Sequence, residues 1–474
     1  MGEVRHNCGL CITHTLHDAY NFLEKSLQHR GREAAGIAAV GEESIDVLKW
    51  SGSVSTFDVI DLHKLLPGHN YHTFLGHVRY ATQGRKDKIL EDAHPHVLGG
   101  IEDCRGSHVI IRNCEAAIVH NGQVDIGLLN DVDLGKMKTR CDSEAVLLYY
   151  KEKGEKELIR KVPLAYTLAI ADKKRKDIIV LRDRFGIKPG ALGFKGGKYC
   201  VASEDIAIKN SVEGKFVEDL TPGAIYYLNN DGSYKKEKIL EPQKKHCFFE
   251  WNYIAHVDSI LDNESVRSAR VSLGEMLADE FNPSDVNFAT YLPRCPETAA
   301  RSYAAKTGID FIEVFYKMRG ERSFFGSTKD ERAYSINNNL YLLPGIEQII
   351  GGKNLIVIDD STIRGNNALR AINLLSDKGK TNKIYLANYT PPIGVIGADG
   401  IPRGCLFGVD MPPSDNFIIR KGSLEEISEK LGAQIFYLSV NGMLKAFENV
   451  GIGRKSLCNY CVGGEHPCSS LEHG

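Results

Sequence analysis

The stretch NLIVIDDSTIRGNN, residues 354–367, decides how the second half of the chain folds. Its apolar residues from Leu355 to Ile358 have the length and composition of a short buried strand. Two adjacent carboxylates, Asp359 and Asp360, follow this run, and a hydroxyl-rich loop with one glycine comes next. Beyond the loop, apolar residues recur at helical spacing, at Ala368, Ala371, Ile372 and Leu375. The stretch therefore predicts a strand, a loop and a helix in succession.

The predicted loop has the chemistry of a ribose phosphate site. Free backbone N–H groups at the start of a helix, beyond the carboxyl end of a strand, favour a phosphate. Asp359 and Asp360 cannot bind phosphate themselves, but carboxylates suit ribose hydroxyls or a magnesium ion beside it. The alternative interpretation is an ordinary loop in which Asn366 caps the helix.

Length and charge narrow the class of protein. A chain of 474 residues is too long for one ordinary core, so two domains are expected and three are possible. The formal net charge of −2 gives no reason to expect nucleic acid or an anionic membrane as a partner. No stretch approaches the roughly 20 apolar residues of a membrane span, and the N-terminus lacks a secretory signal, so we expect a cytoplasmic protein. The 12 cysteines are then expected to be reduced thiols, catalytic groups or metal ligands.

Two patterns divide the chain. Residues 1–230 are rich in strand-like runs, after an amphipathic helix predicted at residues 15–29. A lysine-rich stretch, KKEKILEPQKKH (235–246), is expected to lead out of this domain. From residue 264, helices alternate with short apolar strands, which predicts a parallel sheet covered by helices on both faces. The strand-like runs of the first half are AAGIAAV (34–40), TFLGHVRYA (73–81), AAIVHNG (116–122), YTLAIAD (166–172) and DIIVLRD (177–183).

Residues 354–367 resemble the phosphoribosyl pyrophosphate (PRPP) motif of type I phosphoribosyltransferases. The resemblance implies that Asp359 and Asp360 hold the ribose hydroxyls and a magnesium ion. It also implies that the following loop wraps the 5'-phosphate, through Ser361, Thr362, Arg364, Gly365, Asn366 and Asn367.

Two further segments of the second half resemble parts of the same family's site. LPRCPETAA (292–300) is similar to a pyrophosphate loop, and the matching residues are Pro296, Glu297 and Thr298. KMRGERSF (317–324) is similar to a flexible closing loop, in which Lys317, Arg319 and Arg322 would neutralise pyrophosphate. The alternative for such a charged segment is a solvated surface.

Cys8, in RHNCGLC (5–11), is a candidate nucleophile. Removal of residues 1–7 would expose its α-amino group, which could act as the base for its own thiol. The alternative is an inert thiol, which is the more common role of a single early cysteine.

The segments around and after Cys8 resemble the class II glutamine amidotransferase domain of the N-terminal-nucleophile hydrolases. They are CGLC (8–11), LQHRGREAAGI (27–37), GHVRYATQG (76–84), VHNGQVD (119–125), CDSE (141–144) and LRDRFGIKPG (181–190). The resemblance implies that Cys8 attacks the glutamine amide, while Asn121 and the N–H of Gly122 stabilise the oxyanion. Arg79 would bind the α-carboxylate and Asp142 the α-ammonium. Arg30, Gly31, Arg182 and Asp183 would shape the pocket, with surface ion pairs as the alternative, and Cys11 is assigned to the core.

Cys458 and Cys461 form a C-x-x-C pair, which is too few ligands for a closed metal site. By resemblance to family segments, HCFFEWNYIAHVDS (246–259) and PRGCLFGVD (402–410) supply Cys247 and Cys405. Four thiolates suit a structural [4Fe–4S] cluster, and zinc is the alternative. Cys468 has no assigned role, and the rest are expected to be inert thiols: Cys104, Cys114, Cys141, Cys200 and Cys295.

From Cys8 to Cys461 the chain resembles the amidophosphoribosyltransferases, also called glutamine PRPP amidotransferases. The resemblance implies an α/β and α+β protein. A four-layer αββα glutaminase domain of the N-terminal-nucleophile hydrolase type (8–240, after a possible propeptide, 1–7) would precede a type I phosphoribosyltransferase domain (260–440). A tail with metal-ligand cysteines (441–474) would follow. The implied reaction converts glutamine, PRPP and water to 5-phosphoribosylamine, glutamate and pyrophosphate, the first step of purine biosynthesis. Magnesium, a homo-oligomer and inhibition by purine nucleotides are also implied.

Three alternatives stay open. Asn366 and Asn367 stand where the family usually has threonines, and Arg32 where it has glutamine, so a divergent paralogue could combine a working glutaminase with an altered or inactive PRPP site. A non-enzymatic PRPP sensor would need no intact glutaminase residues. A different glutamine amidotransferase would share the first half but not residues 354–367.

Overall fold

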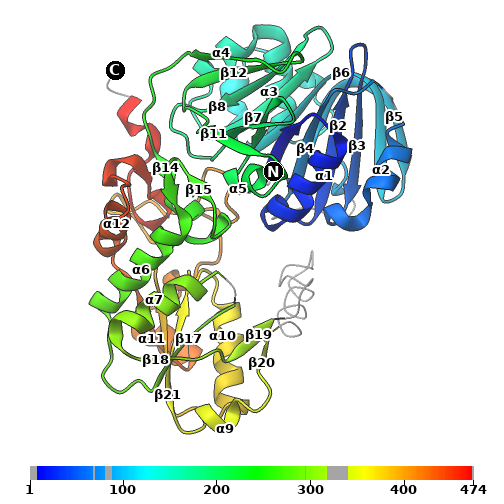
Figure 1. Ribbon diagram of the computed structural model, residues 1–474. Coiled ribbons are helices and arrows are strands. Elements are labelled where there is room, and N and C mark those ends of the chain that lie inside the picture. The colour runs from blue at the N-terminus through cyan, green and yellow to red at the C-terminus, as the bar shows by residue number, and fades with distance from the viewer. Residues whose placement is uncertain (1–7, 68–69, 81–87, 294, 318–339, 472–474) are drawn as a thin grey trace.

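The computed structural model describes residues 8–67, 70–80, 88–293, 295–317 and 340–471 (Figure 1). An antiparallel sheet is formed by the first half of the chain and a parallel sheet by the second half. In Figure 1 these lie at opposite ends of the molecule, with strand β14 and the C-terminal part of the chain between them.

The antiparallel sheet has 13 strands, and every neighbouring pair in it is antiparallel. The strand β5 (His96–Arg105) pairs with β6 alone, as a hairpin. The others run in the spatial order β11 (Lys215–Asp219), β9 (Ala191–Lys195), β10 (Lys198–Ala202), β1 (Gly9–Thr13), β4 (Thr73–Arg79), β2 (Ala34–Val40), β3 (Ile45–Ser51), β6 (His108–Gly122), β7 (Tyr166–Asp172), β8 (Asp177–Arg182), β12 (Ala224–Asn229) and β13 (Tyr234–Lys238).

Alternate residues of these strands face different cores, as the period of a strand requires. Leu10 and Ile12 of β1 share one core with Ala169 of β7 and Val180 of β8, so the two halves of the sheet pack face to face. Cys11 points the other way, into a core shared with the first helices. This arrangement confirms the predicted αββα layers and the core position of Cys11. The covering helices are α1 (Leu16–Asn21), η1 (Phe22–Leu27), η2 (Gln28–Arg30), α2 (Val59–Leu65) and α5 (Asp205–Lys209) on one side and α3 (Asp142–Lys153) and α4 (Glu155–Lys161) on the other.

The parallel sheet has five strands and helices on both faces, as predicted. On β21, Ile356 and Ile358 face one helical layer, while Leu355 and Val357 face the other. Its strands are, in spatial order, β18 (Asp310–Phe311), β17 (Phe288–Tyr291), β21 (Asn354–Asp359), β22 (Lys383–Asn388) and β23 (Gln434–Tyr437). One face carries α6 (Val266–Glu280), α7 (Glu297–Thr307) and α12 (Val440–Glu448), and the other α9 (Glu347–Ile350), α10 (Asn366–Asn373), η8 (Leu374–Lys378) and α11 (Leu424–Leu431).

The order of the parallel strands creates a switch point between β17 and β21. The chain passes from β17 outward to β18 and then returns to the other side of β17 to form β21. Ligands of open parallel sheets bind beyond the carboxyl ends of the strands at such a point. The segments that follow Tyr291 of β17 and Asp359 of β21 leave the sheet there, so the fold places their starts side by side.

The two sheets are joined through short elements. The strand β14 (His246–Cys247) pairs in parallel with β24 (Leu457–Cys458) from the C-terminal part of the chain. Between β14 and α6 lie η7 (Glu250–Ile254), β15 (Ile260–Leu261) and β16 (Glu264–Ser265), and beside the parallel sheet β19 (Phe315–Lys317) pairs with β20 (Leu340–Leu342). Residues 460–462 form the short helix η11.

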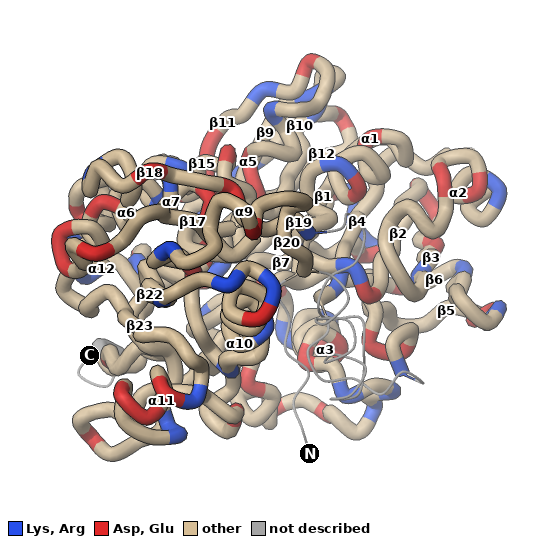
Figure 2. Tube along the Cα trace, turned by 90° about the horizontal axis from the view of Figure 1, so that it is seen from below, with Lys and Arg blue, Asp and Glu red and all other residues tan. Residues whose placement is uncertain are grey.

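The lysine-rich stretch 235–246, expected to be only a connection, begins as the edge strand β13. Exposed Lys235 and Lys236 suit an edge, since charged side chains protect an open strand from pairing with another chain. Figure 2 shows basic and acidic residues mixed over the elements of both sheets. In the described part of the chain, no helix is both long and apolar enough to cross a membrane.

Candidate functional site

Cys8 immediately precedes β1 and is fully buried, beside the end of β4 that carries Arg79. Gly9 pairs with Val78 in the antiparallel ladder, so Cys8 lies opposite Arg79. The Nε of Arg30 donates a hydrogen bond to the Cys8 carbonyl at 3.0 Å. Burial raises the pKa of the Cys8 thiol to about 12, against the opposing effect of nearby Arg79, Lys188 and Arg30. A thiol with this pKa is protonated at neutral pH, so it needs a base to act as a nucleophile.

The groups expected around Cys8 are buried, and several of their polar atoms have no hydrogen-bond partner in the described part of the chain. Both side-chain atoms of Asn121 are in this state, as are Nε and Nη1 of Arg79, and both residues are fully buried. A buried polar group without a partner costs free energy, which a bound ligand can recover. The His77 Nε2 lies 3.0 Å from the His120 carbonyl and thereby joins β4 to β6, just before Arg79 and Asn121.

Two glycines allow close packing here. A Cβ atom on Gly122, whose φ is +154°, would lie 2.0 Å from the carbonyl oxygen of Ala165. A Cβ atom on Gly31 would lie 2.4 Å from the backbone carbon of Arg79. Only glycine therefore fits at either position, and Gly31 lets the loop after η2 pack directly on the backbone of Arg79.

Asp142 begins α3 and accepts a hydrogen bond from the N–H of Val124 at 2.7 Å through Oδ2. Asp92 is a residue of this site that the sequence analysis missed. Its Oδ2 lies 3.3 Å from Nη2 of Arg79, and its Oδ1 has no hydrogen-bond partner among the described residues. Burial raises the pKa of Asp92. Arg79 is therefore held by Asp92 on one side, and its Nε and Nη1 have no hydrogen-bond partner among the described residues, so both nitrogens can donate to an anion.

Arg30 and Arg182 each form ion pairs that are buried, not the surface ion pairs that were the alternative. Arg30 binds Glu204 at 2.6 Å and Glu250 at 3.0 Å, and thus ties the antiparallel sheet to η7. Arg182 binds Asp262 through both terminal nitrogens, at 2.7 and 2.8 Å. In the same turn, Asp183 accepts backbone hydrogen bonds at Tyr166, Phe185 and Gly186.

Arg30→Met should destabilise the protein strongly, by about 3–5 kcal/mol, because Glu204 and Glu250 stay buried but lose the guanidinium that binds both, with only His29 left near Glu204 and Lys188, at 4.0 Å, near Glu250. Burial alone would raise the pKa of Glu204, but His29 and Arg30 hold this pKa well below its usual range. The stabilisation from ionised Glu204 is present above the pKa of glutamate in the unfolded chain and is lost as pH falls. The difference in unfolding free energy between wild type and variant should therefore shrink below about pH 4. Urea unfolding at pH 7 and pH 4 measures it.

Arg454→Met is the matched control. Arg454 lies 2.7 Å from Glu448 Oε1, but both side chains are about 40% exposed. An exposed pair contributes at most about 1 kcal/mol. Equal losses in the two variants would contradict a buried structural role for Arg30.

Asp359 and Asp360 lie at the carboxyl end of β21, beside the switch point, and both are buried. Burial and repulsion by Asp360 raise the pKa of Asp359, and burial raises the pKa of Asp360 to about 6. Lys317 opposes the shift at both carboxyls, so it lies close enough to act on them. Two carboxylates in this state are oxygen ligands that suit a divalent cation.

The loop after Asp360 leads into the start of α10. Ser361 Oγ donates to Asp360 Oδ1 at 2.8 Å, and buried Thr362 donates to Asn388 Oδ1 at 2.7 Å. Gly365 precedes α10 with φ +87°, where a Cβ atom would lie 2.5 Å from Ile418 Cδ1. Asn366 and Asn367 are exposed in the first helical turn, where backbone N–H groups have no helical acceptor.

The other residues expected at the PRPP site lie in three different places. Arg364 is held by Asp415 at 2.5 Å and by Asp410 at 3.5 Å, on the loop before η9 (Ile418–Arg420), so its guanidinium is already engaged. Lys317 ends β19, while Arg319 and Arg322 lie outside the described residues. The predicted pyrophosphate loop leaves β17 and leads into α7, with Pro296 at the N-cap and Glu297 and Thr298 in the first turn.

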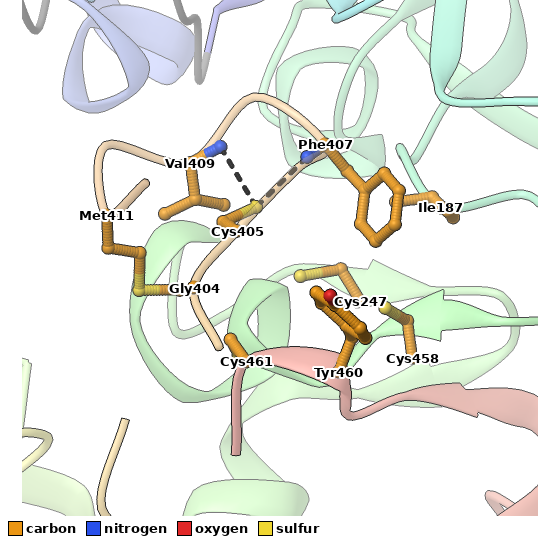
Figure 3. A pocket seen from close by; sticks show the side chains of 10 residues that line it. All are labelled: Ile187, Cys247, Gly404, Cys405, Phe407, Val409, Met411, Cys458, Tyr460 and Cys461. Carbon is orange, nitrogen blue, oxygen red and sulfur yellow. Dashed lines mark hydrogen bonds between the residues drawn. The ribbon is translucent and has the colours of Figure 1, made fainter. Parts of the chain in front are cut away.

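Cys247, Cys405, Cys458 and Cys461 line one cavity between the two sheets (Figure 3). Cys247 and Cys458 are paired across β14 and β24, and all four thiols are buried. The N–H groups of Phe407 and Val409 donate to Cys405 Sγ, each at 3.3 Å. Burial raises the pKa of Cys247 to about 12 and also raises the pKa values of Cys458 and Cys461. Without a cation these thiols are therefore protonated at neutral pH, whereas a bound metal would deprotonate them.

Four buried thiols around one cavity are a donor set for an iron–sulfur cluster or for zinc. An iron–sulfur cluster binds each thiolate through a different iron atom. The backbone N–H donors at Cys405 suit a cluster. Cys468, half-buried at the edge of this core, does not line the cavity.

Comparisons with known proteins agree with this geometry. Residues 109–241 match the family described as a glutamine amidotransferase domain. The amidophosphoribosyltransferase of Methanocaldococcus jannaschii is 30% identical, over 93% of this chain and 92% of that protein. That of Methanothermobacter thermautotrophicus is 29% identical, over 98% of this chain and 95% of that protein.

Solved structures agree as well. The structure of the allosteric regulatory enzyme of purine biosynthesis has a TM-score of 0.80 and 26% identity, with 97% of this chain and 96% of that chain covered. The glutamine PRPP amidotransferase of B. subtilis complexed with ADP and GMP has a TM-score of 0.78 and 26% identity, with 97% of each chain covered. Because sequence and structure match nearly full-length relatives across both sheets, the chain belongs to the amidophosphoribosyltransferase family.

Proposed function

We propose that the chain converts glutamine, PRPP and water to 5-phosphoribosylamine, glutamate and pyrophosphate, the first step of purine biosynthesis. The observation that carries the proposal is the Asp359–Asp360 loop at the switch point of a parallel sheet. It is joined in one chain to buried Cys8 and to Arg79 and Asn121, which carry buried polar atoms with no hydrogen-bond partner among the described residues. Such atoms favour binding of a polar ligand. A glutaminase alone would not need the first feature, and a PRPP sensor would not need the second.

In the first site, Cys8 would attack the side-chain amide carbon of glutamine. Its proton passes to the α-amino group freed by removal of residues 1–7, since burial keeps the thiol protonated otherwise. Asn121 and the Gly122 N–H would hold the oxyanion, and ammonia leaves. Arg79 would bind the α-carboxylate through Nε and Nη1, and Asp142 would bind the α-ammonium. Water would then hydrolyse the thioester.

In the second site, ammonia would attack the anomeric carbon of PRPP as pyrophosphate leaves. Asp359 and Asp360 would bind the ribose hydroxyls and the magnesium ion, which supplies charge neutralisation for the leaving pyrophosphate. The N–H groups at the start of α10, with Ser361, Thr362 and Gly365 to Asn367, would hold the 5'-phosphate. Lys317, Arg322 and the turn at Pro296 are proposed for the pyrophosphate.

The domains are proposed as an amidotransferase domain (8–240), a phosphoribosyltransferase domain (260–440) and a tail (441–474). The B. subtilis relative was solved with ADP and GMP bound. We propose that purine nucleotides also inhibit this chain and that it forms a homo-oligomer, as carried over from its family.

The direct test is to purify the chain anaerobically and measure glutamate and pyrophosphate release from glutamine and Mg²⁺, with and without PRPP. Equal release of both products, dependent on PRPP, is the expected result. Glutamate release that ignores PRPP, without pyrophosphate, would instead establish a glutaminase with an altered second site. One observation favours that second candidate: Arg364 is held by Asp410 and Asp415 rather than left for a phosphate.

The four-cysteine cavity is proposed to hold a [4Fe–4S] cluster that stabilises the junction of the two sheets. Cys458→Ser should lower bound iron from about four atoms per chain to near none and remove the visible absorbance of the cluster. Cys468→Ser, in the same part of the chain but outside the cavity, should keep both. Iron analysis and absorbance after anaerobic purification measure this. Stoichiometric zinc without iron in the wild type would overturn the proposal.

A further inference from the structure

A group of buried imidazoles and one thiol lies beside the glutamine pocket, outside the residues used in the reaction. His94, His96 and Cys141 each place one possible ligand atom within 4.8 Å of the other two. The histidines come from the chain just before and at the start of β5, and Cys141 is the N-cap of α3. All three are buried. The sequence analysis treated Cys141 as an inert thiol, because its partners lie more than 40 positions away.

His96 presents an unpaired nitrogen to this group. Its Nε2 is buried and has no hydrogen-bond partner among the residues that the structure describes, and the residue is only 3% exposed. The ring is hydrogen-bonded to the backbone of Asp92, and with Nε2 unpaired that bond belongs to Nδ1. A histidine that donates its other ring N–H to a backbone carbonyl is typical of a metal ligand, because the bond fixes the tautomer and the ring orientation.

Neighbouring side chains fix the second imidazole. His94 Nε2 lies 2.8 Å from Ser143 Oγ, which also lies 2.9 Å from His120 Nδ1, so one hydroxyl holds two rings. His94 stacks on His77 with ring centroids 4.1 Å apart and meets His96 edge to face at 4.7 Å. With Nε2 engaged by the serine, His94 would bind an ion through Nδ1.

Charges of both signs lie near the group. Arg79 and Lys49 act on His96 and Cys141 as nearby cations. Asp92 and Asp142 are the nearby anions, with Asp92 bound to Arg79 and Asp142 next to Cys141. A thiolate at Cys141 would therefore leave a divalent cation only partly neutralised, which suits a further anionic or water ligand.

We propose that His94, His96 and Cys141 bind one zinc ion. Two imidazole nitrogens and one thiolate are a zinc donor set, and three protein ligands leave a fourth position for water. The ion would join the start of β5 to the start of α3, and so link the segments that carry Asp92 and Asp142 on either side of the glutamine pocket. This site is separate from the four-cysteine cavity and does not depend on the proposed function.

The test uses the full chain, without a histidine tag, dialysed against micromolar zinc and then against zinc-free buffer. About one zinc ion per chain should remain, and zinc K-edge X-ray absorption should show a first shell of nitrogen with a single sulfur. The iron cluster does not contribute at this edge. A shell of four sulfurs would place the zinc in the other cavity and overturn the proposal, as would a wild type that retains no zinc.

Variants locate the ion. Cys141→Ser and His96→Ala should each lose the retained zinc, while iron content stays as in the wild type. Cys200→Ser is the matched control, because Cys200 is a buried thiol of the same sheet that lies outside the group, and it should keep its zinc. Zinc retained equally in all three variants would overturn the assignment. If a variant fails to fold, the wild-type absorption spectrum still decides.

Discussion

Cys8→Ala should reduce glutamine-dependent synthesis by at least about 10³-fold while leaving ammonia-dependent synthesis near the wild-type rate. The variant removes the sulfur that forms the thioester, but it touches nothing in the parallel sheet, where ammonia meets PRPP. Pyrophosphate release is measured with either glutamine or a high concentration of ammonium at mildly alkaline pH. Loss of both activities together would contradict two separable sites.

Cys11→Ala is the matched control for this prediction. Cys11 is as fully buried as Cys8 and lies on the same strand, yet its side chain faces the helical core. Its removal should cost stability through the cavity it leaves, and both activities should stay within about tenfold of wild type. If Cys11→Ala abolished the glutamine reaction and Cys8→Ala did not, the nucleophile would be misassigned.

Local patterns in the sequence predicted the fold where a strand is buried on both faces and therefore reads as a continuous apolar run. The runs at 34–40 and 166–172 coincide with β2 and β7, because alternate residues of each strand enter two different cores. The β5–β6 hairpin was missed. Residues 99–105 on β5 are exposed, and a register shift after Leu98 interrupts the alternation, so burial leaves no pattern there to read.

Some residues of the candidate site could be predicted from short motifs, and others could not. Arg79, Asn121 and Asp142 stand within short motifs, and strand pairing brings the first two to the same end of the sandwich. Asp92 and the imidazole group were not predicted, since their partners come from distant strands and no spacing along the chain records such contacts. The motif predicts Arg364 as a phosphate ligand, but its guanidinium forms ion pairs with Asp410 and Asp415, more than 40 positions later in the chain.

Asp360→Asn should stabilise the ligand-free protein while abolishing its second reaction. Because burial raises the pKa of Asp360 to about 6, its ionisation costs free energy in the folded state. Below about pH 4, the pKa of an aspartate in the unfolded chain, Asp360 is protonated in both states and its burial as a charge costs no stability. This free-energy cost grows as pH rises to about 6 and is complete at pH 7. Removing the charge should therefore add about 2 kcal/mol at pH 7 in the presence of EDTA, and nothing at pH 4.

The same substitution should lower pyrophosphate release by at least about 100-fold, because a neutral amide is a poor magnesium ligand. Magnesium should also raise the urea midpoint of the wild type but not that of the variant. Asp377→Asn, an exposed carboxylate on η8, is the control and should change neither quantity. A variant that is less stable at pH 7, or one that still releases pyrophosphate, would show that these carboxylates are ordinary loop residues. Gain of stability with loss of activity would mean that the fold carries a buried charge whose cost the bound cation offsets.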